Sequence, residues 1–254
     1  MRKGVYMVGK KFFLLILLVM TVSVVWAFQF SPLEQVFEPT GVNSQKTYTV
    51  VNDSEDQIAI EFSVLARDQD SSGEEIRTDA SAKFVISPSK VIVAPGSTYV
   101  IRVKYRATSA ALTVEESYRL VARQMPYSLG KSETTQSMFN FLYIYYSSLY
   151  VTPSETLVKI EVPSIKARID EEGNKVMDVT IRNRGNVHQI LLDAALTVKD
   201  STGRSVVLDS SEALPGIDSM NILARKSVTK SIPWPSDLPF VEGASYTATI
   251  SYSN

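Results

Sequence analysis

FNFLYIYYSSLYVTP, residues 139–153, is the stretch of sequence that decides the fold. It alternates one aromatic set with a second apolar set: Phe139, Phe141, Tyr143 and Tyr145 against Leu142, Ile144 and Tyr146. Side chains along a strand point alternately to opposite faces, so both faces of this strand are apolar. A strand in a small all-β domain normally shows one polar face to water. Either the fold buries this strand on both sides, or a partner covers one side.

The 254-residue chain begins like an exported protein. Basic residues precede the apolar run 12–25, FFLLILLVMTVSVV, which is short for a membrane span of about 20 residues. Val25-Trp26-Ala27 has the small-x-Ala pattern of a cleavage site. We therefore expect residues 1–27 to be a signal peptide cleaved near Ala27, with an uncleaved membrane anchor as the alternative.

The net charge and the absence of cysteine exclude several classes of function. Loss of Arg2, Lys3, Lys10 and Lys11 leaves 22 basic against 27 acidic residues, a net charge of −5. This balance argues against a nucleic-acid binder. The chain has no cysteine, so packing alone must hold an exported fold, and cysteine-based zinc sites and thiol chemistry are excluded.

The mature sequence reads as short strands separated by turn signals. Ile58–Leu65 and Thr98–Tyr105 alternate, whereas the polar stretch 68–75, with Gly73, is expected to be a loop. No segment has a helical period of useful length. This spacing predicts an all-β fold of sandwich domains. A boundary near Pro153 gives a first immunoglobulin-like sandwich over 28–153 and a second over 154–254.

The sequence offers no case for an enzyme. His188 is the single histidine and follows a turn signal, and no Gly-x-Ser-x-Gly elbow or glycine-rich phosphate loop is present. The acid pairs Glu74-Glu75 and Glu115-Glu116 are adjacent, so their side chains point to opposite faces. We predict no catalysis, no metal, no cofactor and no small-molecule substrate, and we expect His188 to be a structural or surface residue.

Several segments resemble one known family when taken in order. They are YTVVN at 48–52, FVISP at 84–88 followed by APG at 94–96, ESYRLVARQMP at 116–126, the long strand into Pro153, and NRGNVH at 183–188. Each segment alone is weakly specific. Their order and spacing over most of the mature chain are similar to those of the PapD-like periplasmic pilus chaperones.

This resemblance implies two immunoglobulin-like sandwiches in a boomerang arrangement and a protein partner. Such a chaperone caps pilus subunits in the periplasm by donor-strand complementation and delivers them to an outer-membrane usher. By alignment to Pro153, Phe139, Phe141 and Tyr143, with Tyr145 beside them, would enter the subunit. The other set, Leu142, Ile144 and Tyr146, would then face the chaperone's own core.

The chain also departs from the family pattern. The family holds the subunit's terminal carboxylate with an Arg on the first strand and a Lys on the last strand. The matching positions here are Glu34 and Ser148, and neither can donate a charge-assisted hydrogen bond to a carboxylate as Arg or Lys does.

Two other features follow from the same comparison. Arg119 and Arg123 are candidate substitute anchors, although arginines on a strand surface are commonly only solubilising. Glu116 would keep the acidic member of the family's interdomain ion pair, whose Arg partner falls on Thr152.

Two alternatives stay open at this point. One is a structural or adhesive exported protein built on the same sandwiches, such as a pilus component. Another is a carbohydrate-binding module that would use Trp234 and Tyr246.

Overall fold

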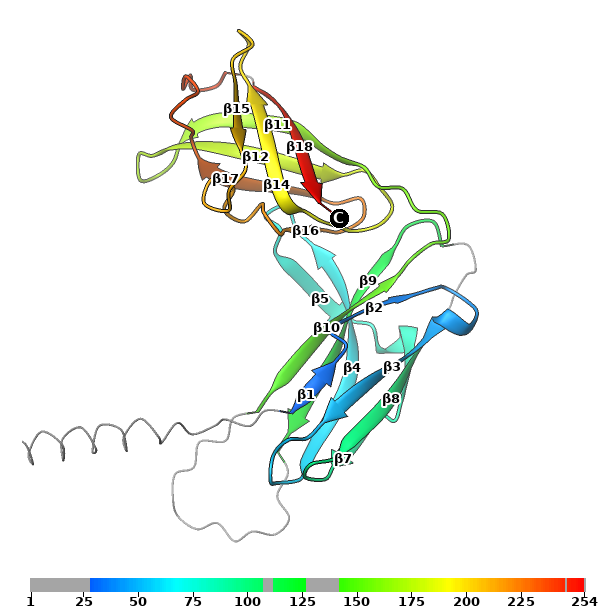
Figure 1. The fold of residues 1–254 in the computed structure, drawn as a ribbon. Helices are drawn as coiled ribbons and strands as arrows, with labels where there is room; N and C mark the ends of the chain where they lie inside the picture. The colour runs from blue at the N-terminus through cyan, green and yellow to red at the C-terminus, as the bar shows by residue number, and fades with distance from the viewer. Residues whose placement is uncertain (1–27, 107–111, 127–141, 245, 254) are drawn as a thin grey trace, which may run out of the picture.

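The computed structural model describes residues 28–106, 112–126, 142–244 and 246–253, and nearly all of its regular structure is β-strand. Two β-sandwich domains lie at an angle to each other (Figure 1), so the predicted fold class is confirmed. Among the described residues, no helix is long and apolar enough to cross a membrane. The expected signal peptide lies outside the described residues.

The first domain packs two sheets against each other. One has the order β1-β3-β8-β6, formed by Gln29–Ser31, Gln45–Val51, Thr98–Tyr105 and Phe84–Ser87. The other has the order β2-β10-β9-β4-β5, with β7 also paired to β4; its strands are Glu34–Phe37, Ile144–Val151, Glu116–Met125, Ile58–Gln69, Glu75–Asp79 and Lys90–Val93. Two short 3₁₀ turns, η1 (Val42–Ser44) and η2 (Ser81–Lys83), lie in the connections.

Alternation along the strands builds the core of this domain. On β4, where the sequence alternates, the buried residues are Ile58, Ile60, Phe62 and Val64. Phe30 stacks on Tyr48 with ring centroids 5.5 Å apart, and Tyr48 is fully buried. Removing these side chains from water contributes about 25 cal/mol per Å² of apolar surface. The core therefore holds this domain together without a disulfide.

The second domain is a smaller sandwich. Its main sheets are β11-β12-β17 (Ile160–Ile169, Lys175–Asn183, Ser227–Pro233) and β15-β14-β18 (Ser205–Leu208, Leu192–Lys199, Thr247–Ser253). A two-stranded pair joins β13 (Gln189–Ile190) to β16 (Asn221–Ile222). The hairpin predicted at Glu171–Asn174 forms between β11 and β12, with Gly173 at φ +85°.

Trp234 and Tyr246 belong to the packing of the second domain. The Trp234 indole donates to the carbonyl of Leu238 at 2.8 Å, and its ring meets that of Tyr246 edge-on at 5.0 Å. Tyr246 is buried. The pair does not form an exposed aromatic platform for a sugar.

The polar stretch predicted as a loop, residues 68–75, is a turn at its centre and strand at its two ends. β4 continues to Gln69 and β5 begins at Glu75, so only residues 70–74 form the turn. Asp70 caps this turn by accepting from the backbone N–H groups of Ser72 and Glu74 at 2.8 and 2.9 Å. The adjoining ends of β4 and β5 lie beyond the core of the first domain, so they do not need alternating apolar residues. They extend towards the second domain (Figure 1).

Candidate partner-binding strand and interdomain cleft

Strand β10 has one open edge. Along its whole length it pairs antiparallel with β9, from Ile144 opposite Arg123 to Val151 opposite Glu116. On its other side β2 pairs with it in parallel, but only from Ser148 to Val151. Ahead of Ser148, this edge meets no strand within the described part of the chain. An unpaired edge offers main-chain donors and acceptors to another strand.

One face of β10 joins the core of the first domain. Leu149 and Val151 are fully buried there, and Tyr143 and Tyr145 are partly buried against the same cluster. The Tyr145 ring meets Phe28 edge-on at 4.8 Å, and its hydroxyl donates to the Phe28 carbonyl. Phe139 and Phe141 lie outside the described residues.

The prediction that Leu142, Ile144 and Tyr146 face the core is wrong. Their exposed fractions are 47%, 40% and 37%. The core side of β10 is fixed by Leu149 and Val151, and the period of two places Tyr145 and Tyr143 on that side. The other set must therefore point outward.

The second domain covers the outward face at its far end, at Tyr150. This side chain is fully buried, and its ring stacks on His188 with centroids 3.6 Å apart and planes 9° from parallel. Its hydroxyl accepts hydrogen bonds from Arg67 at 2.9 Å and from Asn221 at 2.8 Å. Tyr150 therefore packs in the junction between the two domains. The alternation of residues in the sequence does not show whether a buried residue packs in a domain junction or in a domain core.

A carboxylate and three guanidinium groups meet on the outward face of this sheet. Glu75 on β5 accepts from Arg67 on β4 at 2.8 Å, from Arg119 on β9 at 2.6 Å, and from Arg77 on its own strand. Burial alone would raise the pKa of Glu75, but the hydrogen bonds and charges of these arginines outweigh burial and lower it to about 2. We call Glu75, Arg67, Arg77 and Arg119 the arginine group. It carries three positive charges against one negative.

The structure brings one of the two proposed anchors to this group. The Arg119 Nη1 donates to the Ser148 hydroxyl at 2.6 Å, and Ser148 lies directly opposite Glu34 in the parallel β2–β10 pair. Arg123 is exposed beside Ile144 and has no ion pair or side-chain hydrogen bond among the described residues. Arg119 therefore places a cation at the Ser148 position, whereas Arg123 stands apart from it.

The interdomain acid is Glu115 and not Glu116. The Glu115 side chain is 1% exposed and accepts from the His188 backbone N–H at 3.0 Å and from the Thr152 hydroxyl at 2.9 Å. The His188 Nδ1 lies 2.6 Å from the same carboxylate. Glu116 points to the other side, as adjacent residues on a strand do, and binds the hydroxyls of Tyr105 and Tyr118. His188 is thus a structural residue of the domain junction.

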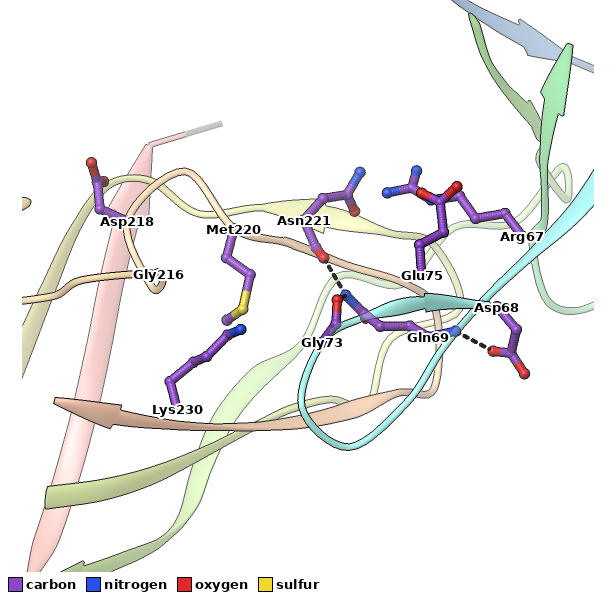
Figure 2. Close-up of a pocket in the computed structure, with 10 residues that line it drawn as sticks. All are labelled: Arg67, Asp68, Gln69, Gly73, Glu75, Gly216, Asp218, Met220, Asn221 and Lys230. Atoms are coloured by element: carbon purple, nitrogen blue, oxygen red, sulfur yellow. Dashed lines mark hydrogen bonds and ion pairs between the residues drawn. The ribbon is translucent and has the colours of Figure 1, made fainter. Parts of the chain in front are cut away.

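The β4–β5 hairpin forms the other half of the junction. The Gln69 side chain donates to the Asn221 carbonyl at 2.9 Å, the Thr229 N–H donates to the Ser71 carbonyl at 2.8 Å, and Lys226 pairs with Asp68. A pocket of about 290 Å³ lies between this hairpin and the second domain, with Arg67 and Glu75 on one side and Lys230 on the other (Figure 2). The hairpin therefore contacts the second domain and also carries Glu75.

Solved structures similar to this chain are fimbrial chaperones. The class 5 fimbriae chaperone CfaA matches with a TM-score of 0.54 and 17% identity over 90% of this chain and 100% of its own. A chaperone–tip adhesin complex of CFA/I fimbriae biogenesis matches with 0.54 and 17% over 88% and 98%. The CsuC–CsuE chaperone–tip subunit complex of Acinetobacter baumannii matches with 0.53 and 14% over 83% and 89%. These likenesses show the two-domain fold.

No curated protein matches this sequence. A family match covers most of the first domain, including the arginine group and β10: residues 38–156 match the PapD N-terminal domain of the pili and flagellar-assembly chaperones. This match includes the segments YTVVN, FVISP and ESYRLVARQMP, on which the resemblance was based. Residues 38–156 are therefore similar in sequence to the N-terminal domain of the PapD-like pilus-assembly chaperones, and the fold of both domains is similar to that of solved fimbrial chaperones.

Proposed function

We propose that this protein is a periplasmic chaperone that binds a pilus subunit by lending it strand β10, and that it acts by binding and not as an enzyme. The observation that carries the proposal is the open edge of β10 ahead of Ser148, next to a run that is aromatic and apolar on both faces. An exposed edge of this kind aggregates unless a partner strand covers it. A subunit that lacks one strand of its own sandwich would supply that cover.

The subunit would bind by extending the core of the first domain. Tyr143 and Tyr145 already pack at the end of that core, and Phe139 and Phe141 precede them in the sequence at the same alternation. Each aromatic side chain that enters the subunit removes about 150–250 Å² from water. At about 25 cal/mol per Å² this gives about 4–6 kcal/mol per ring as an upper bound. Association costs reduce that gain, and main-chain pairing along the open edge fixes the register.

Arg119 and Arg123 remain proposed anchors for the subunit's terminal carboxylate. Arg119 has the better support because it lies at the Ser148 position, where the family has a lysine, and it is tied to Glu75. Guanidinium groups bind carboxylates through paired, charge-assisted hydrogen bonds. Delivery of the bound subunit to an outer-membrane usher completes the proposed role.

Isolation of the protein from the periplasm of its own cells tests this function. Cells that express their fimbrial genes are crosslinked, the tagged protein is purified, and bound proteins are identified by mass spectrometry. We expect one main partner, a pilus subunit, protected from protease while bound. Recovery of the tagged chain as a stable part of assembled surface fibres would instead support the structural or adhesive alternative.

A further inference from the structure

The outward face of β10 carries an apolar column that the strand-lending proposal leaves unused. Leu142, Ile144 and Tyr146 point away from the core, whereas the proposed lent residues have the opposite parity. The second domain covers this face only further along, at Tyr150. An exposed apolar column beside an open strand edge is typical of a binding surface.

Arg77 borders this column and presents an exposed guanidinium edge. Its guanidinium lies over the Tyr146 ring at 4.4 Å from the centroid, and its Nε donates to Glu75. Its side chain is 39% exposed, and its polar partners in the described part of the chain are Glu75 and the Tyr146 side chain. Arg67 and Arg119 differ because they are 10% and 18% exposed and also bond Tyr150 and Ser148.

The charges around Arg77 favour a further anion. Arg67 and Arg77 are directly opposite each other in the β4–β5 pair, where like charges repel. Glu75 compensates one of the three positive charges in the arginine group and orients all three guanidinium groups. Two positive charges remain on a mature chain whose net charge is −5, so this part of the surface attracts acidic groups.

We infer that this outward face binds an extended segment of the subunit, with apolar side chains on Leu142, Ile144 and Tyr146 and one acidic side chain on the exposed edge of Arg77. The inference rests on the proposed function for the identity of the partner. β5 lies across β9 and β4 from β10, so Arg77 approaches the column from the side. A side chain that projects from the segment reaches it, whereas the chain end would go to Arg119. Tyr146 holds the Arg77 fork by a cation–π contact and thereby presents it to a planar carboxylate.

Binding measurements with the purified complex test the inference. The partner's acid is identified by crosslinking, and affinities are measured for Arg77→Gln, Ile144→Ser and Phe141→Ala, with Arg102→Gln as the matched control. Arg102 is an exposed arginine of β8 in the other sheet. We expect Arg77→Gln to weaken binding roughly ten- to a hundredfold, the usual effect of losing a hydrogen bond to a charged group, and Arg102→Gln to have no effect. Urea midpoints of all four variants show whether the fold is intact.

Charge exchange makes the pairing specific. Arg77→Glu should abolish the contact, and replacing the partner's acid by Arg should restore affinity to that variant alone. Amidation of the partner's chain end should leave the effect of Arg77→Gln unchanged. If Phe141→Ala lowers affinity while Arg77→Gln and Ile144→Ser bind normally, the outward face is not an interface and this inference fails. If Phe141→Ala also binds normally, the strand-lending proposal itself fails.

Discussion

The contact between Glu115 and His188 gives the sharpest test of how the two domains are held together. His188→Leu removes the ring that stacks on Tyr150 and the group 2.6 Å from a carboxylate that is 1% exposed. Glu115 then stays buried with only the Thr152 hydroxyl and one backbone N–H as partners. Losing a hydrogen bond to a charged group typically costs about 1.5–3 kcal/mol, because the buried carboxylate is left with an unsatisfied acceptor.

The measurement is urea unfolding of the mature protein followed by fluorescence. Of the two tryptophans in the chain, Trp26 lies within the predicted signal peptide, so Trp234 alone reports on the second domain. With a typical urea slope of about 1–3 kcal/mol per M, a loss at the upper end of that range, about 3 kcal/mol, lowers the midpoint by about 1 M or more. We also expect small-angle X-ray scattering to show a wider range of angles between the domains.

The double variant Glu115→Leu/His188→Leu is the control. Replacing both members of a buried pair by apolar side chains is often nearly neutral. We therefore expect the double variant to recover most of the midpoint that His188→Leu loses. If the two substitutions are instead additive, or if His188→Leu alone has no effect, the pair does not hold the junction and the reasoning is refuted.

Three further predictions concern the strand, the arginine group and export. Phe141→Ala should keep a near-normal urea midpoint and lose subunit protection, whereas Leu149→Ala should lose about 2–5 kcal/mol as a fully buried residue; equal loss of stability in both would contradict strand lending. The pKa of Glu75 in the folded protein lies below its usual 4.5, so the stability that Glu75 contributes is present above pH 4.5 and is lost as the pH falls towards 2. Glu75→Gln should therefore make stability depend less on pH between about pH 4.5 and pH 2, as measured by acid unfolding with circular dichroism; an unchanged pH dependence would contradict this role of Glu75. N-terminal sequencing of the exported protein should begin at or near Phe28, and a membrane-bound product that retains Met1 would contradict cleavage.

Alternation of apolar and polar residues was sufficient to predict the sandwich fold, but it did not predict which face of every strand is buried. On β4 the burial alternates along the strand, as the alternation of residues 58–65 in the sequence indicates. On β10 both sets are apolar, and the face that is buried at Tyr150 is open at Ile144. A local pattern cannot show that a second domain covers one end of a strand. This is why the prediction reversed the exposure of Leu142, Ile144 and Tyr146.

Long-range charge contacts were the least predictable part of the site. Glu75 was expected in a loop, yet it joins arginines on β4, β5 and β9. His188 gave no signal beyond being the only histidine, and its partner Glu115 is 73 residues away. The offset of one residue from Glu116 to Glu115 reverses which side of the strand the acid occupies. Sequence alignment at low similarity does not resolve such a shift.

The register of β10 supports the proposal that Arg119 supplies the charge at Ser148, the position where the resemblance implies a lysine. Ser148 is the first residue of β10 that β2 covers, so it lies where the open edge ends. Its antiparallel neighbour on β9 is Arg119, whose side chain reaches the Ser148 hydroxyl. Cross-strand neighbours have Cβ atoms about 4.5–5.5 Å apart. A cationic side chain at this position of β9 can therefore reach nearly the same place as one on the neighbouring residue of β10. A serine at 148 and an arginine at 119 therefore leave a positive group where the open edge of β10 ends, and Glu75 fixes its orientation.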